Sequence, residues 1–233
     1  MTDTAAPATA ATDDKIIRLT AMRGMIAAKM LESLATTAQL THHADCDTTG
    51  LAAMKARLQS DGLKGSVEDL IIDAVVRSLR QHPGLNALLI DKEIHVKSAI
   101  NVAVAVALPG DLLVAPAIFD AGAMDLNARV QARRDVVERA KINKLTVKEM
   151  TGGTFTISNI GLTRVRHFTP ILNVPQVAIL GVGQTALRPW VVDGRIEARP
   201  IMGLSLTFDH RAVNGAPAAD FLTTLCNTIE AMA

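Results

Sequence analysis

Apolar residues recur at helical spacing in several stretches of the chain. An apolar residue at every fourth position predicts an opening helix, and this stripe consists of Met22, Ile26, Met30 and Leu34. Ser66 and Asp69 form a capping box ahead of a second such stretch, whose apolar positions are Leu70, Ile71, Ala74, Val75 and Leu79. Helices are also predicted over about residues 126–141 and 216–231, and a capping box at residues 146–149 predicts the start of a further, short helix.

Other stretches show the runs and alternations that are typical of β-strands. Residues 101–108 are a nearly continuous run of Val and Ala, which predicts one strand covered on both faces. Residues 112–118 predict another strand, and Pro116 places it at a sheet edge or a bulge. A hairpin turn is predicted at Asp193-Gly194, among strands over residues 154–158, 177–183, 188–192, 195–199 and 201–208. Mixed strands with helices on one side predict an α+β layered sandwich.

The composition is that of a globular protein with an aliphatic core. Of the 233 residues, 49% are apolar and 3% aromatic, and the formal net charge is +1. This balance offers no basic surface for nucleic acid and no charged face for a membrane, so neither partner is predicted. Cys46 and Cys226 are too few and too far apart for a disulfide framework, which predicts a reducing compartment such as the cytoplasm.

The N-terminal segment differs from the rest of the chain. Residues 1–14 are rich in Ala and Thr and have no large apolar side chain beyond Met1. Such a segment cannot offset its ordering entropy, so it is predicted to be a flexible tail or linker remnant. Residues 15–233 are predicted to form one domain, in which Asp91-Lys92-Glu93 is a hairpin turn.

A polar cluster at the end of the last predicted strand offers candidate chemistry. The alternation over residues 201–208 runs into His210, and Asn214-Gly215 follows four residues later. Imidazole is the usual proton acceptor near neutral pH, although most histidines are ordinary surface or core residues, so the pattern alone leaves both interpretations open. The other histidines lack metal-ligand spacing, and no metal site is predicted. Gly181-Val-Gly183 does not open a helix and predicts no nucleotide loop.

Five segments share more specific features. They are residues 22–30 (MRGMIAAKM), 100–106 (INVAVAV), 151–161 (TGGTFTISNIG), 171–180 (ILNVPQVAIL) and 209–215 (DHRAVNG). In this order they resemble the motifs of the dihydrolipoamide acyltransferases, the core components of 2-oxo acid dehydrogenase complexes. The resemblance covers about residues 15–233 as a catalytic domain. It implies a chloramphenicol acetyltransferase-like fold, a two-layer α+β sandwich with a mixed β-sheet and helices on one side.

The resemblance also implies roles for individual residues. It makes His210 the general base that forms a thiolate and Ser158 the hydroxyl that donates to the oxyanion. Asn214 stands where most members carry Asp, and it organises the site by hydrogen bonding alone. Arg23 and Lys29 would meet the phosphates of coenzyme A, and Phe168 would line the substrate channel. From the residues alone, Ser158 could instead cap its turn, Arg23 and Lys29 could be a solvated helix face, and Phe168 could be core.

The function implied is transfer of an acyl group between dihydrolipoamide and coenzyme A, with the lipoyl group carried on another domain or protein. The expected partners are a lipoyl domain, other components of a 2-oxo acid dehydrogenase complex, and two further copies of the chain in a homotrimer with active sites between subunits. Two alternatives are a non-catalytic structural homologue of the core and a standalone small-molecule acetyltransferase. The sequence does not identify the acyl group.

The assembly is expected to stop at the trimer, near three times 24.7 kDa. Members that build larger cores continue past the final helix with a Leu-rich tail, whereas this sequence stops at Met232-Ala233. This sequence contains no lipoyl domain. Such a domain could have been removed from a longer chain, or the gene could never have encoded one.

Overall fold

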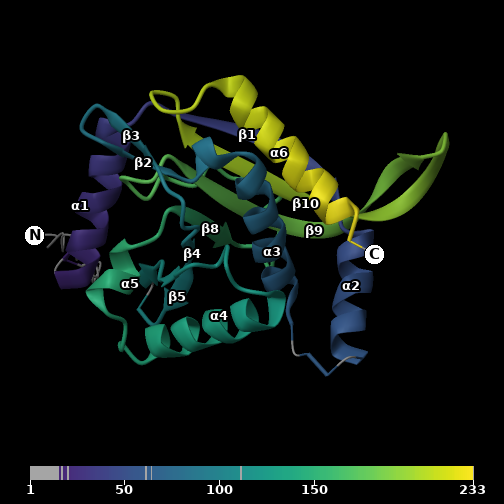
Figure 1. Ribbon diagram of the computed structural model, residues 1–233, viewed down its shortest axis with the longest axis horizontal. Helices are drawn as coiled ribbons and strands as arrows, with labels where there is room; N and C mark the ends of the chain where they lie inside the picture. Colours follow the sequence, from purple (N-terminus) through teal and green to yellow (C-terminus); the bar gives the residue numbers. More distant parts are fainter. Residues whose placement is uncertain are drawn as a thin grey trace, which may run out of the picture.

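The computed structural model describes residues 16, 18–19, 21–60, 62–63, 65–110 and 112–232. The flexible tail predicted for residues 1–14 lies outside them. Six strands form the central sheet in the order β1-β10-β9-β8-β4-β7, and Figure 1 shows the helices α3, α4 and α6 gathered on one side of it. The strands are β1 (Gln39–Asp47), β4 (Val102–Val104), β7 (Ala117–Ile118), β8 (Phe155–Asn159), β9 (Ala178–Val192) and β10 (Arg195–Asp209). Because β8 runs parallel to both neighbours and the other pairs are antiparallel, the sheet is mixed, as predicted.

The core lies between this sheet and the helices α3 (Val67–Gln81) and α6 (Gly215–Glu230). The predicted apolar face of the last helix is confirmed, because Phe221, Leu222, Leu225 and Ile229 are all buried. Every second strand residue faces these helices, and the buried set on the sheet includes Phe155, Ile157, Leu180, Val182, Leu204, Leu206 and Phe208. Aliphatic burial of this kind contributes about 1.5–3 kcal/mol per large side chain.

The helix starts follow the local signals in the sequence. Ser66 caps α3 and Thr146 caps α5 (Val147–Thr151), each in a complete capping box, and Asp125 caps α4 (Leu126–Lys141). The opening helix is confirmed as α1 (Ala21–Thr36), but its apolar stripe does not enter the core. Leu34 is 54% exposed, whereas the other three stripe residues line a cavity described below.

Several predicted strand boundaries were wrong. Residues 101–108 are not one strand covered on both faces, because the chain leaves the main sheet at Ala105. Only β4 is buried throughout, whereas β5 (Val106–Leu108) pairs with β6 (Leu112–Val114) in a separate two-stranded sheet with Ala107 exposed. Pro116 splits the next predicted strand into β6 and β7, and β7 does lie at the sheet edge. Residues 177–183 and 188–192 merge into β9, and 195–199 and 201–208 merge into β10.

One strand of the main sheet and one α-helix were not predicted at all. β1 contains two histidines and two aspartates, so it lacks an apolar alternation, yet it pairs with β10 along its whole length at the sheet edge. α2 (Thr49–Ser60) buries only Leu51 and Leu58. The predicted hairpin turn at residues 91–93 joins β2 (Ala87–Ile90) to β3 (Glu93–Val96), which pair with each other outside the main sheet.

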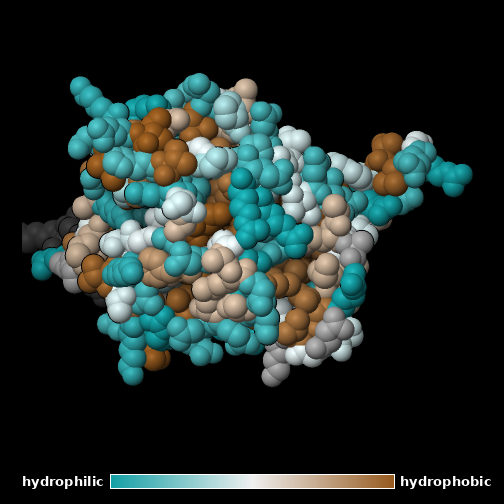
Figure 2. Space-filling view, viewed as in Figure 1, coloured by the Kyte–Doolittle hydropathy of each residue, from teal (hydrophilic) through white to brown (hydrophobic). Residues whose placement is uncertain are grey.

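β9 and β10 continue beyond the body of the molecule as a two-stranded ribbon, seen at the right of Figure 1. They turn at Asp193 and Gly194, both with positive φ, which confirms the predicted hairpin turn. Leu187, Val191 and Ile196 lie on one face of the ribbon and are 74%, 69% and 79% exposed. Figure 2 shows hydrophobic atoms near the end of this ribbon.

The face of the sheet away from α3 and α6 is covered by residues 160–175, here called the crossing segment. It runs from the end of β8 over β9 and β10 before the chain re-enters the sheet. Its backbone is hydrogen-bonded to β9 at two points: Ile160 N–H donates to Val182 O at 2.9 Å, and Gln184 N–H donates to Val165 O at 2.8 Å. Phe168 N–H donates to Ser205 Oγ at 3.4 Å. The crossing segment therefore lies directly against the strand backbones.

Glycines make this close approach possible. A Cβ added to Gly183 of β9 or to Gly203 of β10 would overlap the carbonyl oxygen of Arg166. At Gly181, an added Cβ would come within 2.8 Å of the Phe168 ring. These glycines therefore serve backbone and ring contact, and the Gly181–Gly183 pair is part of a strand, in keeping with the prediction of no nucleotide loop.

We expect Gly183→Ala and Gly203→Ala each to lower the free energy of unfolding by about 3 kcal/mol or more, because backbone must move to admit the methyl group. Thermal or urea unfolding measures the change. Gly84→Ala is the matched control, since an added Cβ there meets nothing within 4 Å, and its stability should be unchanged or slightly raised. Equal behaviour of the three variants would contradict the packing argument.

Candidate active site

Ser158 lies near the end of β8, on the sheet face that the crossing segment covers. It pairs with Gly181, over which the Phe168 ring lies, so the serine and this ring are neighbours. Both line a cavity of about 450 Å³ between α1, β8 and the crossing segment. In the described part of the chain, no side-chain hydrogen bond engages the Ser158 hydroxyl. That hydroxyl is therefore available to donate to a molecule in the cavity.

The turn after β8 is capped by a different residue. Asn159 Oδ1 accepts a hydrogen bond from Gly161 N–H at 2.9 Å. The Asn159 side chain also helps to offset the burial that raises the pKa of Glu68 on α3. The alternative interpretation of Ser158 as a turn cap is wrong, because Asn159 performs that task.

His210 begins the loop that follows β10. Its backbone N–H donates to Ala38 O at 2.8 Å, which fixes the start of the loop against the end of α1 and β1. The imidazole is exposed and lies with its ring centre 6.0 Å from that of Phe208. The His210 side chain has no hydrogen-bond partner among the residues that the structure describes. A proton acceptor at this position is thus open to a ligand or to another chain.

An ion pair between a buried carboxylate and a partly exposed arginine holds the His210 loop. Asp209 is 1% exposed, and its carboxylate accepts hydrogen bonds from Ala38 N–H at 3.2 Å and Arg211 N–H at 3.1 Å. The Arg211 guanidinium donates to the same carboxylate at 2.6 Å. Burial raises the pKa of Asp209, but the hydrogen bonds from Arg211 and Ala38 outweigh it, so the net pKa is lowered. Sequence reasoning did not select this pair, although both residues stand in the motif around His210.

Asn214 is the N-cap residue of α6, with extended backbone geometry. Its carbonyl accepts from Ala218 N–H at 3.2 Å, but its side chain makes no capping hydrogen bond. The exposed amide is four residues from His210 on the same loop. Asn214 therefore belongs with His210 rather than with the Ser158 cavity.

Within one chain, Ser158 and His210 do not meet. Ser158 pairs with Gly181, and Gly181 pairs with Ser205 on the next strand. His210 lies five residues beyond Ser205, which is roughly 16 Å along the strand at about 3.3 Å per residue. Two strand spacings add a lateral offset of roughly 10 Å. Because neither side chain can span such a gap, a single atom contacted by both requires two copies of the chain.

The remaining predicted residues are placed unequally. Lys29 on α1 lines the Ser158 cavity and also a groove of about 860 Å³ that Asp209 and Arg211 line. Burial lowers the pKa of Lys29, and nearby Glu32 acts in the opposite direction. The Arg23 guanidinium donates to Gly110 O at 2.6 Å, and Arg23 lines neither the cavity nor the groove. The structure thus brings Lys29 and Phe168 to Ser158, but not Arg23.

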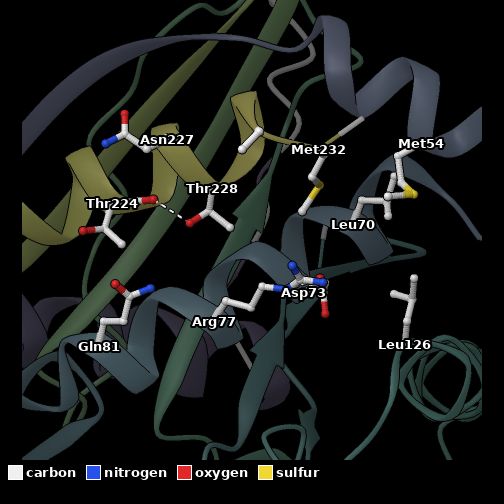
Figure 3. A pocket seen from close by; sticks show the side chains of 11 residues that line it. Met54, Leu70, Asp73, Arg77, Gln81, Leu126, Thr224, Asn227, Thr228 and Met232 are labelled. Carbon is white, nitrogen blue, oxygen red and sulfur yellow. Dashed lines mark hydrogen bonds and ion pairs between the residues drawn. The ribbon is translucent and has the colours of Figure 1, made fainter.

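A further pocket of about 560 Å³ lies between α3 and α6, away from all of these residues (Figure 3). Its wall contains Asp73, which is paired with Arg77 at 2.7 Å and with buried Arg129. The Asp73 carboxylate is thus engaged by two guanidinium groups. Within the described residues, no three or more His, Cys, Asp or Glu side chains cluster to hold a metal ion. The described helices include none long and apolar enough to cross a membrane.

Comparison with known proteins identifies the family and the fold. The family model described as 2-oxoacid dehydrogenases acyltransferase (catalytic domain) matches residues 11–233. This chain belongs to that family. The chloramphenicol acetyltransferase structure matches with a TM-score of 0.55 at 15% identity, over 88% of this chain and 93% of that one, which confirms the predicted fold.

Characterised relatives agree with this assignment. The dihydrolipoyllysine-residue acetyltransferase component of the acetoin cleaving system of Bacillus subtilis is 38% identical over 92% of this chain and 55% of that protein. The bovine mitochondrial succinyltransferase component of the 2-oxoglutarate dehydrogenase complex is 35% identical over 91% of this chain and 48% of that protein. The chain therefore spans about half the length of these relatives.

Two solved structures are similar over nearly the whole chain. A probable dihydrolipoamide acetyltransferase of Listeria monocytogenes matches with a TM-score of 0.89 at 29% identity, over 95% of this chain and 96% of that one. The Azotobacter vinelandii dihydrolipoamide acetyltransferase matches with a TM-score of 0.86 at 29% identity, over 97% of this chain and 98% of that one. The latter was studied for the role of a serine, a histidine and an asparagine in its catalytic mechanism.

We expect Asp209→Asn to lower the free energy of unfolding by about 2 kcal/mol at pH 7, less than for a fully buried pair because Arg211 is partly exposed. Because the pKa of Asp209 is lowered in the folded protein, its stabilising effect is complete above its unfolded pKa of about 3.9 and is lost as the pH falls through the folded value. Thermal melts at pH 7, 5 and 3.5 should therefore show the gap to wild type shrinking only in the most acidic sample. Asp135→Asn, in an exposed pair with Arg139, is the control and should change stability by less than about 0.5 kcal/mol.

Proposed function

We propose that this catalytic domain transfers an acyl group between dihydrolipoamide and coenzyme A. The observation that carries the proposal is the spacing of three residues. In the Azotobacter vinelandii enzyme the serine and histidine are 52 residues apart and the histidine and asparagine four apart, and Ser158, His210 and Asn214 have the same spacings. The positions of these side chains, with a serine hydroxyl in a cavity and an exposed imidazole at a strand end, suit acyl transfer between thiols.

In this mechanism His210 takes the proton from the attacking thiol. A thiol of pKa about 8.5 and an imidazole of pKa about 6.5 are close enough for a positioned base to act near neutral pH. The thiolate adds to the thioester carbonyl, and the Ser158 hydroxyl donates a hydrogen bond to the oxyanion that forms. The carbon–sulfur bond to the original thiol then breaks, and the departing thiolate recovers the proton from His210. Every proton and electron pair is thereby accounted for.

The separation of Ser158 from His210 supports an active site shared between subunits. We place Ser158, Phe168 and the cavity on one subunit and His210 with Asn214 on its neighbour, in a homotrimer. Asn214 orients groups near the imidazole by hydrogen bonding, since its amide carries no charge. Lys29 lines both the Ser158 cavity and the groove at Asp209 and Arg211. It is the candidate to bind a phosphate of coenzyme A. Arg23 is proposed as a second phosphate contact with less support, because it is tied to Gly110.

The partners follow from the chemistry and from the relatives. The lipoyl group is carried by another domain or protein of a 2-oxo acid dehydrogenase complex, of which the curated relatives are components. We propose a cytoplasmic location. Cys46 and Cys226 are buried free cysteines, which suits a reducing compartment, and one of the similar proteins comes from the bacterium Bacillus subtilis.

We expect His210→Ala to reduce the rate of acyl transfer by about 10²–10⁴-fold, the usual contribution of one general base. Ser158→Ala should reduce it by about 10²-fold, because one oxyanion donor is lost. The assay follows dihydrolipoamide acylation from acetyl-, isovaleryl- and succinyl-coenzyme A, with coenzyme A binding measured in parallel and expected to change little. Near-normal turnover of His210→Ala would remove the proposed base, and absence of transfer in the wild type with every donor would favour a non-catalytic homologue.

The shared site predicts complementation. When His210→Ala and Ser158→Ala chains are mixed under conditions of subunit exchange, some interfaces combine an intact His210 with an intact Ser158. Activity should therefore rise well above that of either variant alone, to a sizeable fraction of wild type. Mixed assembly is verified with chains of two different masses. Demonstrated exchange without recovery of activity would contradict an intersubunit site.

A further inference from the structure

The walls of the Ser158 cavity are almost entirely apolar. Its aliphatic and methionine lining comes from α1, α5, β6 and the crossing segment, and it closes against β9 at Ile179. The wall includes Met22, Met25, Ile26, Met30, Leu113, Val114, Met150, Pro170 and Ile171. A volume of about 450 Å³ is in the range of small-ligand sites. It greatly exceeds the space that the methyl group of an acetyl thioester needs.

Methionine is concentrated in this wall. Four of the nine methionines of the chain line the cavity, three of them on α1. An unbranched thioether side chain with several rotatable bonds adapts to ligands of different shape, whereas branched side chains fix one shape. The wall on α1 therefore suits flexible or branched aliphatic groups of more than one length.

Charge on the wall is limited to one described side chain, Lys29. Glu32, three residues along the same helix, already supplies negative charge near Lys29, and burial disfavours the charged form of the lysine. The Thr156 hydroxyl donates to Gln176 Oε1 at 2.6 Å and is thus engaged within the protein. If Lys29 binds a coenzyme A phosphate, as proposed above, Asn173 is the remaining polar side chain of the described wall apart from Ser158 and Thr156. A carboxylate placed here would then lose its hydration for few polar contacts, which disfavours a dicarboxylic acyl group.

The geometry around Ser158 relates this wall to the reaction. If the Ser158 hydroxyl donates to the carbonyl oxygen of the thioester, the acyl chain must extend into space that borders Ser158. Ala105 marks the start of that space, because its N–H donates to Ile157 O at 2.9 Å, beside the serine, and its methyl group lines the cavity. The apolar wall begins there and continues to α1 and α5.

We propose, on the basis of the proposed function, that the cavity is an acyl pocket that selects uncharged aliphatic acyl groups larger than acetyl. Branched and medium-length acyl groups are its substrates, and succinyl is disfavoured. The methionines of α1 contact the far end of the acyl chain, and Ala105 sets the width next to the thioester.

The first test measures kcat/KM of the wild-type protein with acetyl-, isobutyryl-, isovaleryl-, hexanoyl- and succinyl-coenzyme A. Each additional methylene that enters the cavity should raise kcat/KM by about fourfold, so isovaleryl should exceed acetyl by at least tenfold. Succinyl should fall below isovaleryl by about 10²-fold or more. Preference for acetyl or succinyl would overturn the proposal while leaving acyl transfer intact, and no transfer of any acyl group would overturn the proposed function itself.

The second test narrows the cavity. Ala105→Leu should lower kcat/KM for hexanoyl-coenzyme A at least tenfold more than for acetyl-coenzyme A. Ala107→Leu makes the same change two residues further, at an exposed position of β5 outside the cavity, and should leave every ratio unchanged. Thermal melts confirm that both variants fold, and the wild-type series decides the proposal if Ala105→Leu does not.

The lipoyl arm is the other aliphatic group in the reaction, so it could occupy the cavity in place of the acyl group. Changing the thiol acceptor distinguishes these two occupants. Each acyl-coenzyme A is assayed with dihydrolipoamide and with the short dithiol 1,3-propanedithiol. The proposal requires the loss in Ala105→Leu to follow the acyl group with either acceptor. A loss that appears only with dihydrolipoamide, and equally for all acyl groups, would place the lipoyl arm in the cavity and refute the acyl pocket.

Discussion

The close approach of the crossing segment to β9 and β10 is the contact on which the rest of the site depends. Two strand glycines, Gly183 and Gly203, leave room for the Arg166 carbonyl, and Gly181 leaves room for the Phe168 ring. A β-strand face normally presents side chains about every 7 Å, which would hold a covering loop away from the backbone. Because the side chains are missing here, the loop lies flat and forms one wall of a cavity around Ser158 instead of an open sheet face.

The part of the cavity wall at Met150 depends on electrostatic contacts between helices. Arg139 on α4 forms two hydrogen bonds to Glu149 of α5, at 2.9 and 2.5 Å, and together with the cap at Thr146 it holds the pKa of Glu149 at about 2. Stability from this carboxylate is complete above its unfolded pKa of about 4.3 and fades only as the pH falls toward 2. Met150, the next residue, faces the cavity. The pair thus fixes the wall of a pocket from a position outside it.

Local signals in the sequence were sufficient for the α-helices other than α2, but not for the sheet. Capping boxes at Ser66 and Thr146 are complete within four residues, so their structural meaning can be read without knowing the fold. β1 has no apolar alternation, and its stability comes from pairing with β10, more than 150 residues away. The run of Val and Ala around Ala105 likewise gave no sign that the chain leaves the main sheet there. His210 and Ser158, and the expectation of active sites between subunits, came from the motif resemblance. The distance that separates the two residues within one chain follows from strand register, which no periodicity encodes.

The ribbon formed by β9 and β10 makes the stability of these two strands uneven along their length. Near Leu180 and Leu206 these strands are buried between a helix layer and the crossing segment, whereas beyond Leu187 they pair only with each other and expose apolar side chains. An isolated two-stranded hairpin is marginally stable in water. Each strand is therefore unbroken in its geometry, but its two halves differ in stability against local unfolding. The outer half can open and close while the half that lies in the main sheet, near Ser158, stays folded. The boundary between two cooperative folding units thus falls within a single strand.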